Sequence, residues 1–168
     1  MDRLGVEKWL EDHGVKNYTI NEDLSVVVNG DVDISFKDLE CIPISFRNVS
    51  GKFNCGYNKL FTLEGCPVSV GGDFYCVNNK LTLLEGCPTS VAGNFYCYNN
   101  YLTSLDGFPI VEGIINCLNN KIGEFELFLY EYDTSEQVIQ YYNGKNLNEK
   151  LQISLSEDVT VIKKQSKL

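Results

Sequence analysis

A unit of about 21 residues recurs along this chain, and it constrains the fold more than any other feature. Five glycines mark it at spacings of 21, 21, 21 and 20 residues: Gly30, Gly51, Gly72, Gly93 and Gly113. Each has a valine two residues before it, an apolar residue two after, isoleucine or cysteine four after, and leucine or isoleucine nine after. A period of this length is typical of solenoids, in which every repeat forms one coil that packs on its neighbours.

Within the unit, the pattern Phe-x-Cys-x-x-Asn-x-Leu matches the core of a leucine-rich repeat, where an alternating strand precedes an asparagine turn. The buried amide can donate and accept at once, which satisfies main-chain groups that a sharp turn leaves unpaired. A later proline turns the chain back at residues 66–67, 87–88 and 108–109. We therefore expect an α/β solenoid, a right-handed coil of about five 20–21-residue repeats with a parallel β-sheet and extended or 3₁₀ segments on its back.

The regions outside the repeat are expected to close the two ends of the coil, because an open solenoid end exposes its core. The segment "DRLGVEKWLEDHG" predicts a helix, and "YTINEDLSVVV" predicts a hairpin. Three apolar residues of this helix are expected to face inward: Leu4, Trp9 and Leu10. The predicted organisation is an N-terminal cap over 1–27, the solenoid over 28–125, and a mainly helical C-terminal cap over 126–168.

Four of the seven cysteines occupy one inward position in successive coils: Cys55, Cys76, Cys97 and Cys117. Neighbouring strands lie about 4.7–4.9 Å apart, so these thiols should form a line. Tetrahedral zinc needs four sulfurs about 2.3 Å from one point, which a line does not provide. Parallel side chains in register also point the same way, unlike disulfide partners. We expect a packed core row, with Cys66, Cys87 and Cys41 stacked at another corner; a redox or metal role is the alternative.

The composition restricts the kinds of partner. The chain has 168 residues, a formal net charge of -9 and a pI of about 4.6, which argues against binding nucleic acid or an anionic membrane. It contains no apolar run of the roughly 18–20 residues that span a bilayer, and its charged N-terminus lacks the apolar core of a signal peptide. We therefore expect a cytoplasmic location. The final "SKL" would act as a peroxisomal signal only in a eukaryote.

Residues suited to catalysis are few. His13 is the single histidine, and it falls in the predicted cap helix, where a solvated role is expected. The repeat places no general base beside a serine, cysteine or lysine, and its glycines serve tight turns instead of a phosphate-binding loop. The acid pairs Glu22-Asp23 and Asp31/Asp33 could hold a cation, although a solvated acidic edge is the simpler interpretation. We expect no enzymatic activity, cofactor or metal.

Alternate strand positions must face outward, and there the sequence is rich in tyrosine. The residues predicted to bind a partner on this face are Tyr75, Val77, Tyr96, Tyr98, Ile114 and Leu118, together with Asn54 and Asn116. Aromatic residues with little charge are concentrated at the centres of protein interfaces. The alternative is that aromatic and β-branched residues simply favour exposed strands.

The repeat "VGGDFYCVNNKLTLLEGCP" and the leader "KNYTINEDLSVVVNGDVDIS" resemble short leucine-rich-repeat proteins of tailed bacteriophages, over roughly residues 14–122. That resemblance implies a phage origin and a repeat fold, without implying any chemistry. The repeat is similar, more weakly, to the 20-residue repeats of bacterial effector ubiquitin ligases. Those proteins attach a large catalytic domain, which the 43 residues after Phe125 are too few to form.

The predicted function is a non-enzymatic module that binds a host protein, such as a defence component, through the outward sheet face. It would act in the host cytoplasm as a monomer or weak oligomer. One alternative is an acidic decoy that mimics nucleic acid through carboxylates such as Asp31 and Asp33. Another is a protein that sequesters a small ligand, or a cryptic enzyme.

Overall fold

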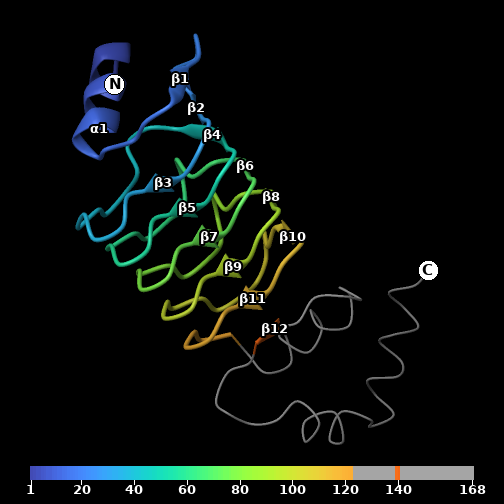
Figure 1. Cartoon of the computed structure of the whole chain (residues 1–168). Helices are drawn as coiled ribbons and strands as arrows, with labels where there is room; N and C mark the ends of the chain where they lie inside the picture. The colour runs from blue at the N-terminus through green and yellow to red at the C-terminus, as the bar shows by residue number, and fades with distance from the viewer. Residues whose placement is uncertain (123–138, 141–168) are drawn as a thin grey trace, which may run out of the picture.

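A computed structural model describes residues 1–122 and 139–140 of the chain. The chain begins with helix α1 (Arg3–Asp12) and the hairpin strands β1 (Tyr18–Ile20) and β2 (Val26–Val28), and then winds into stacked coils (Figure 1). The remaining strands are β3 (Val32–Asp33), β4 (Phe46–Val49), β5 (Phe53–Asn54), β6 (Ser69–Val70), β7 (Phe74–Tyr75), β8 (Ser90–Val91), β9 (Phe95–Tyr96), β10 (Ile110–Val111), β11 (Ile115–Asn116) and β12 (Ile139–Gln140).

The strands form two six-stranded sheets. Sheet A has the order β1-β2-β4-β6-β8-β10, and sheet B has the order β12-β11-β9-β7-β5-β3. The hairpin β1–β2 is antiparallel, and every other strand pair among the described residues is parallel. Four steps along sheet B separate β3 from β11, so this part of the chain makes about four turns of a β-solenoid.

The expectation of a single parallel sheet is corrected, because the valines that precede the glycines form a second parallel sheet. Between residues 13 and 122 the structure contains no helix, as expected for coils of this length. Val49, Val70 and Val91 pair in register along sheet A. A coil of about 21 residues has room for two short strands and their turns, which leaves no length for a helix.

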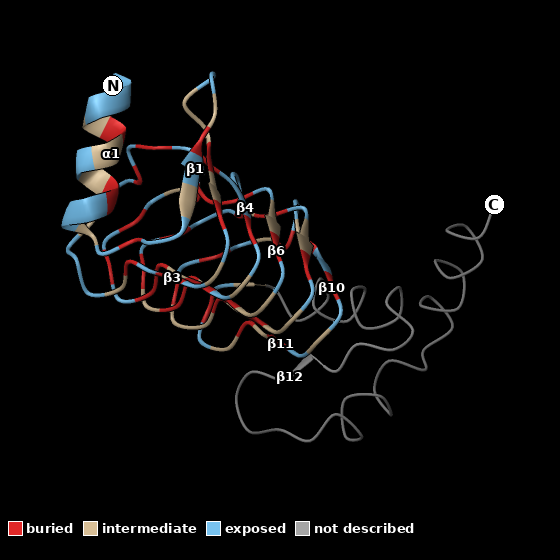
Figure 2. Ribbon diagram, turned by 45° about the horizontal axis from the view of Figure 1, so that its top comes forward, coloured by how far each residue is buried: buried red, intermediate tan, exposed pale blue. Residues whose placement is uncertain are grey.

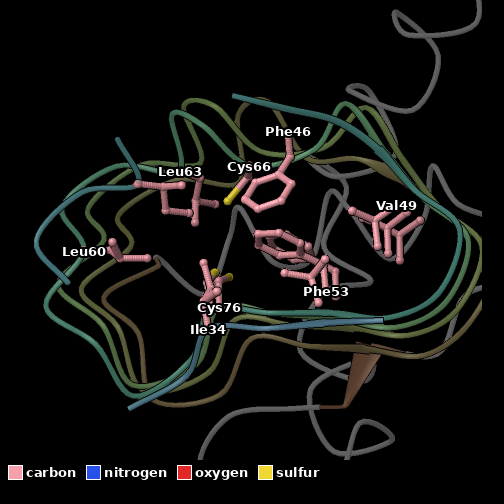
Figure 3. Packing of buried hydrophobic residues seen from close by; sticks show 14 of the residues in the cluster. Ile34, Phe46, Val49, Phe53, Leu60, Leu63, Cys66 and Cys76 are labelled. Atoms are coloured by element: carbon pink, nitrogen blue, oxygen red, sulfur yellow. The ribbon is translucent and has the colours of Figure 1, made fainter. Parts of the chain in front are cut away.

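Equivalent residues of successive coils stack directly on one another in the core. Phe53, Phe74 and Phe95 are fully buried, with ring centroids 5.8 and 5.5 Å apart and interplanar angles of 8° and 10°. Figure 3 looks into the coils and shows these rings between Val49 at one end and Leu60 at the other. The predicted inward columns are confirmed by this packing.

The predicted cysteine row is also part of the core. Cys55, Cys76, Cys97 and Cys117 are all buried, and burial raises the pKa of the Cys76 and Cys97 thiols well above the ordinary value. Cys66 approaches this row from the opposite wall of the coil (Figure 3). Within the described residues, no group of three or more His, Cys, Asp and Glu side chains could hold a metal ion. The stack expected at the other corner is incomplete, since Cys41 is exposed and Cys87 is only partly covered.

A ladder of buried asparagines closes the turn after sheet B, as the sequence predicts. Its members are Asn58, Asn79, Asn100 and Asn120. Asn79 shows the bonding: its Nδ2 donates to the carbonyl oxygens of Cys55 at 3.0 Å and Cys76 at 3.2 Å, while its Oδ1 accepts from the Leu60 backbone nitrogen at 3.0 Å. Each amide therefore joins two neighbouring coils through main-chain groups that the sheets do not pair.

Helix α1 covers the N-terminal end of the stack (Figure 1). Asp2 caps the helix by accepting from the Gly5 nitrogen at 2.9 Å, and Val6 and Leu10 are buried one helical turn apart. The prediction that Leu4 faces inward is wrong, because this residue lies off the stripe of Val6 and Leu10 and is 72% exposed. Trp9 is half-buried and meets the ring of Phe46 edge-on at 6.3 Å. Exposed and buried residues alternate along α1 and the coils (Figure 2).

Most of the predicted helical C-terminal cap lies outside the described residues. Within that segment Ile139 and Gln140 form strand β12, which pairs in parallel with β11 and continues sheet B. This strand differs from the helix expected there, because pairing satisfies the edge of β11 that would otherwise stay open. Among the described residues, no helix combines the length and the apolar character needed to cross a membrane.

Candidate functional site: the outer face of sheet B

Two tyrosines stand side by side on the outer face of sheet B. Tyr75 of β7 and Tyr96 of β9 are in register, and their rings stack at 4.7 Å with an interplanar angle of 13°. The Tyr75 hydroxyl donates to Asp73 Oδ2 at 2.9 Å. Partial burial and the neighbouring Asp73 carboxylate raise the pKa of Tyr75 to about 12. Both rings are half-buried, so they are held in place while one part of each remains open to solvent.

Val77 is the predicted site residue that does not reach the surface. Its exposed fraction is 2%, so the prediction that it lines the binding face is wrong. The preceding coil has Gly56 at the same position, and a Cβ built on this glycine would come 2.9 Å from Val77 Cγ2. The missing side chain leaves room for the valine against the backbone, and a period-two pattern alone does not reveal such a space.

Tyr98 connects the tyrosine pair to aromatic residues in the turn beyond the sheet. Partial burial and the neighbouring Tyr57 side chain raise the pKa of Tyr98. Tyr57 in turn stacks on Phe36, with ring centroids 4.3 Å apart and an interplanar angle of 11°. Tyr75, Tyr96, Tyr98, Tyr57 and Phe36 thus form one aromatic surface, which we call the aromatic strip.

Sequence reasoning missed Phe36 and Tyr57. They directly precede the asparagine position of their coils, a place at which the backbone takes the left-handed conformation, with φ of 55° in both residues. A large side chain is rare in this conformation, where asparagine is better tolerated. The third and fourth coils have Asn78 and Asn99 at this position. The replacement of asparagine by aromatic residues in the first two coils could therefore have identified Phe36 and Tyr57 as candidate site residues.

The other predicted site residues surround this strip, and their roles differ. Ile114 is 41% exposed and Leu118 is half-buried. Asn54 Oδ1 accepts from the Gly56 nitrogen at 3.0 Å, and Asn116 Oδ1 accepts from the Leu118 nitrogen at 3.1 Å. The two asparagines therefore stabilise turns at the ends of their strands, while they remain partly accessible at the edge of the face.

The acidic residues of the first coil are engaged in turns. Asp31 Oδ1 accepts from the Lys52 nitrogen at 2.9 Å, which links two coils. Asp33 Oδ1 accepts from both the nitrogen and the hydroxyl of Ser35 at 3.0 and 2.6 Å. Partial burial acts to raise the pKa of Asp33, but these bonds outweigh it, and the pKa lies below the ordinary value. One oxygen of each carboxylate therefore has a local structural role.

The second acid pair and the histidine lie near the N-terminal cap. Glu22 is exposed, and Asp23 Oδ1 accepts from the nitrogen and hydroxyl of Ser25 at 3.0 and 2.6 Å. His13 stacks on Trp9 with centroids 3.9 Å apart, and its Nδ1 lies 2.7 Å from the Trp9 carbonyl oxygen. These contacts hold the end of α1 in place and bring no nucleophile to the imidazole among the described residues.

A hollow of about 510 Å³ opens beside sheet A. Its lining includes Asp23 and Ser25 of the hairpin loop and Phe46, Arg47 and Asn48 of β4. It contains none of the aromatic-strip residues, so it is a separate feature of the surface.

Comparison with known proteins adds no relative: no protein-family model, no curated protein and no solved structure matches this chain. The candidate site therefore rests on the geometry of the chain itself. Its stacked, partly buried pair Tyr75 and Tyr96 presents apolar ring surface and hydroxyl groups at the surface.

Proposed function

We propose that this protein is a non-enzymatic binding module that holds another protein against the outer face of sheet B. The observation that carries the proposal is the aromatic strip, in which Tyr75 and Tyr96 stack at 4.7 Å and Tyr98 reaches Tyr57. Tyrosine offers a large contact area together with a polar hydroxyl, and it is enriched among the residues that dominate binding energy.

The fixed positions of these rings favour binding. Tyr75 is restrained by its neighbour Tyr96 and by its hydrogen bond to Asp73. Side chains that are ordered before association lose less conformational entropy when a partner arrives. A short strand in a parallel sheet, with its backbone paired on both sides, also keeps the rings in a constant arrangement from coil to coil.

The wider proposal concerns the class of protein and the partner. The coils are of leucine-rich-repeat type, five in number and right-handed, and the protein comes from a tailed bacteriophage. It acts in the cytoplasm of the host cell, as a monomer or weak oligomer, on a host protein such as a defence component. The support is the wording of the repeat "VGGDFYCVNNKLTLLEGCP", together with the absence, among the described residues, of a His, Cys, Asp and Glu cluster that could hold a metal ion.

The test is affinity capture from a bacterial lysate, with mass spectrometry to identify the retained protein. The variant changes three tyrosines of the aromatic strip together: Tyr75→Thr, Tyr96→Thr and Tyr98→Thr. A matched variant changes Val68 and Ile110 to threonine, since both are exposed apolar residues on the sheet A side, at 53% and 76%. The tyrosine variant should fold and lose the captured protein, whereas the matched variant should keep it. Capture that survives in the folded tyrosine variant contradicts the proposal.

The two other functions predict different results in the same assay. An acidic decoy would lose its partner when Asp31 and Asp33 are neutralised, and its binding would weaken steeply with salt. The hydrogen bonds that these carboxylates accept from backbone nitrogens make that function the weaker candidate. A sequestering protein would copurify with a small molecule, and substitution of Arg47 in the hollow beside sheet A would release it.

A further inference from the structure

A second surface lies at the end of each coil where the chain turns away from sheet B. We call it the turn edge, and it comprises residues 36–40, 57–61, 78–82, 99–103 and 119–122. It is the end of the coil that Leu60 fills from inside, opposite Val49 (Figure 3). Four aromatic side chains of the turn edge are well exposed: Phe36 at 71%, Tyr57 at 45%, Phe61 at 56% and Tyr101 at 49%.

The turn edge also concentrates positive charge on an acidic protein. Lys59, Lys80 and Lys121 occupy the same position in three coils, and Lys37 lies in the turn of the first coil. These four lysines face two acids within the edge, Asp38 and Glu40, while the whole chain has a net charge of -9. The edge therefore carries a formal charge of +2 (four lysines less two acids) on a chain whose net charge is -9, and such a local excess of one sign is typical of an interface that recognises charge.

The lysines are held beside the aromatic rings. Lys80 Nζ lies 4.9 Å from the centroid of Phe61, and Lys121 Nζ lies 4.9 Å from the centroid of Tyr101. Lys59 Nζ is 3.0 Å from Asp38 Oδ1, in an ion pair whose members are 46% and 81% exposed. The ammonium groups of Lys80 and Lys121 thus stay at the surface next to apolar ring area, and that of Lys59 stays at the surface in an exposed ion pair.

From this arrangement we propose that the turn edge binds a short acidic segment of a partner protein, laid in extended conformation along the solenoid axis. Coils are spaced about 4.8 Å apart, so the four steps from Phe36 to Lys121 cover about 19 Å. An extended chain rises about 3.3 Å per residue, and the edge therefore accommodates about six residues. The carboxylates of the segment pair with the lysines, and its apolar side chains lie on the rings.

The net charge of the protein favours a short acidic segment over a nucleic acid or an anionic bilayer. Charges are screened over about 8 Å at physiological ionic strength. A segment of a few residues on the turn edge stays close to the lysines and beyond this distance from much of the acidic surface. A long polyanion or a membrane would extend past the edge and meet the repulsion of the whole chain.

The backbone at the N-terminal end of the edge is consistent with a role in recognition. Phe36 and Tyr57 have φ of 55°, a left-handed conformation that is unfavourable for residues with a large side chain. Their rings stack on each other and remain largely exposed, so burial in the core does not offset this cost. A partner that covers the rings would offset this cost.

The turn edge shares Phe36 and Tyr57 with the aromatic strip, but its lysines lie outside the strip, so the lysine variants test this inference separately from the proposed function of the sheet B face. The test is an NMR titration of the isotope-labelled full chain with a capped peptide of three Glu-Leu pairs. We expect the largest amide shifts at residues 57–61, 78–82 and 119–122, and a weaker response as the salt concentration rises. The peptide with lysine in place of each glutamate should produce no such shifts.

Charge variants separate a specific row from general electrostatics. The double variant Lys59→Gln, Lys80→Gln should weaken peptide binding about five- to ten-fold. The matched double variant Lys8→Gln, Lys16→Gln changes two exposed lysines that are not part of the edge and should leave the affinity unchanged. Asp38→Asn should tighten binding about two-fold, because it releases Lys59 from its ion pair.

Several outcomes would overturn the proposal. They are an absence of shifts at millimolar peptide, shifts elsewhere on the chain, or equal losses in the two lysine variants. Stronger binding to a single-stranded oligonucleotide or to phosphatidylserine vesicles than to the acidic peptide would assign the edge to another class of partner.

Discussion

Two neighbouring rows of residues in the turn after sheet B differ in how much the residue type varies from coil to coil. The inner row is asparagine in four successive coils: Asn58, Asn79, Asn100 and Asn120. The outer row, one residue earlier, changes from aromatic to amide along the solenoid: Phe36, Tyr57, Asn78, Asn99 and Asn119. All five outer residues share a left-handed backbone with φ between 52° and 56°, so the turn itself is constant.

The difference shows which positions the backbone dictates. Each inner amide donates to carbonyl oxygens of two coils and accepts from a backbone nitrogen, a combination that other side chains of that size do not provide. The outer side chains are exposed at Phe36, Tyr57 and Asn119 and half-buried at Asn78 and Asn99, and the three outer amides hydrogen-bond to one another. In this solenoid the inner rows build the coil, and the outer rows are the ones that we propose contact a partner.

The largest expected effect separates the two rows directly. Asn79→Ala leaves the Leu60 nitrogen and the carbonyl oxygens of Cys55 and Cys76 without this amide in a buried turn, so unfolding should become easier by about 3–5 kcal/mol. Asn78→Ala places alanine in the left-handed conformation and removes the acceptor of Asn99 Nδ2, and it should cost only about 1–2 kcal/mol. Urea unfolding of both variants measures the difference, and equal losses would show that the rows are equivalent.

The second effect tests why one outward residue of the sheet became buried. Gly56→Ala adds a Cβ 2.9 Å from Val77 Cγ2 and should destabilise the protein by about 1–3 kcal/mol. In the background of Val77→Ala this cost should fall by more than half, since the clashing methyl is gone. Thermal unfolding of the four proteins completes the cycle. Additive losses would mean that Gly56 does not accommodate Val77.

A smaller effect of opposite sign is expected in the outer row. Phe36→Asn replaces an exposed aromatic with a residue that tolerates φ of 55°, and should stabilise the fold by about 0.5–1 kcal/mol, even though the stacking on Tyr57 is lost. Differential scanning calorimetry would record a higher melting temperature. Destabilisation would show that the ring contributes more to folding than its exposure implies.

The smallest expected effect concerns the ionisation of Tyr75 in the aromatic strip. The folded-state pKa of Tyr75, about 12, lies above that of an exposed tyrosine, so the stability that it contributes is complete below about pH 10. This contribution is lost as pH rises toward 12. Absorbance at about 295 nm should reveal a late-ionising tyrosine. The late component should vanish in Tyr75→Phe; if it persists there, another residue is its source.

The sequence was sufficient to predict the inner columns, because period and residue type repeat together. Phe74, Cys76 and Asn79 lie where the pattern put them, and the hairpin and cap helix form as expected. Other features depend on contacts between coils. The burial of Val77 needs the missing side chain of Gly56, and the second sheet arises from short strands that carry only two paired residues each.

The outer face of sheet B shows the same difference between features that the sequence pattern predicts and features that depend on contacts between coils. The pattern placed Tyr75 and Tyr96 outward, but the stacking between them and the bond to Asp73 follow from the register of β7 and β9. The extension of the strip to Phe36 and Tyr57 depends on a backbone conformation. Hydrophobic periodicity does not predict such a conformation, although the occurrence of both aromatic residues and asparagine at one repeat position indicates it.

Photo-crosslinking in bacterial cells tests most directly whether outward side chains of the solenoid contact a partner while the inner rows form the coil. A photoreactive p-benzoylphenylalanine would replace Tyr96 on the outer face of sheet B in one experiment and the exposed Arg47 of β4 in another. The account predicts a discrete covalent adduct with one cellular protein from position 96 and none from position 47. An adduct from position 47 alone would contradict it, as would the absence of any adduct from a folded chain labelled at position 96.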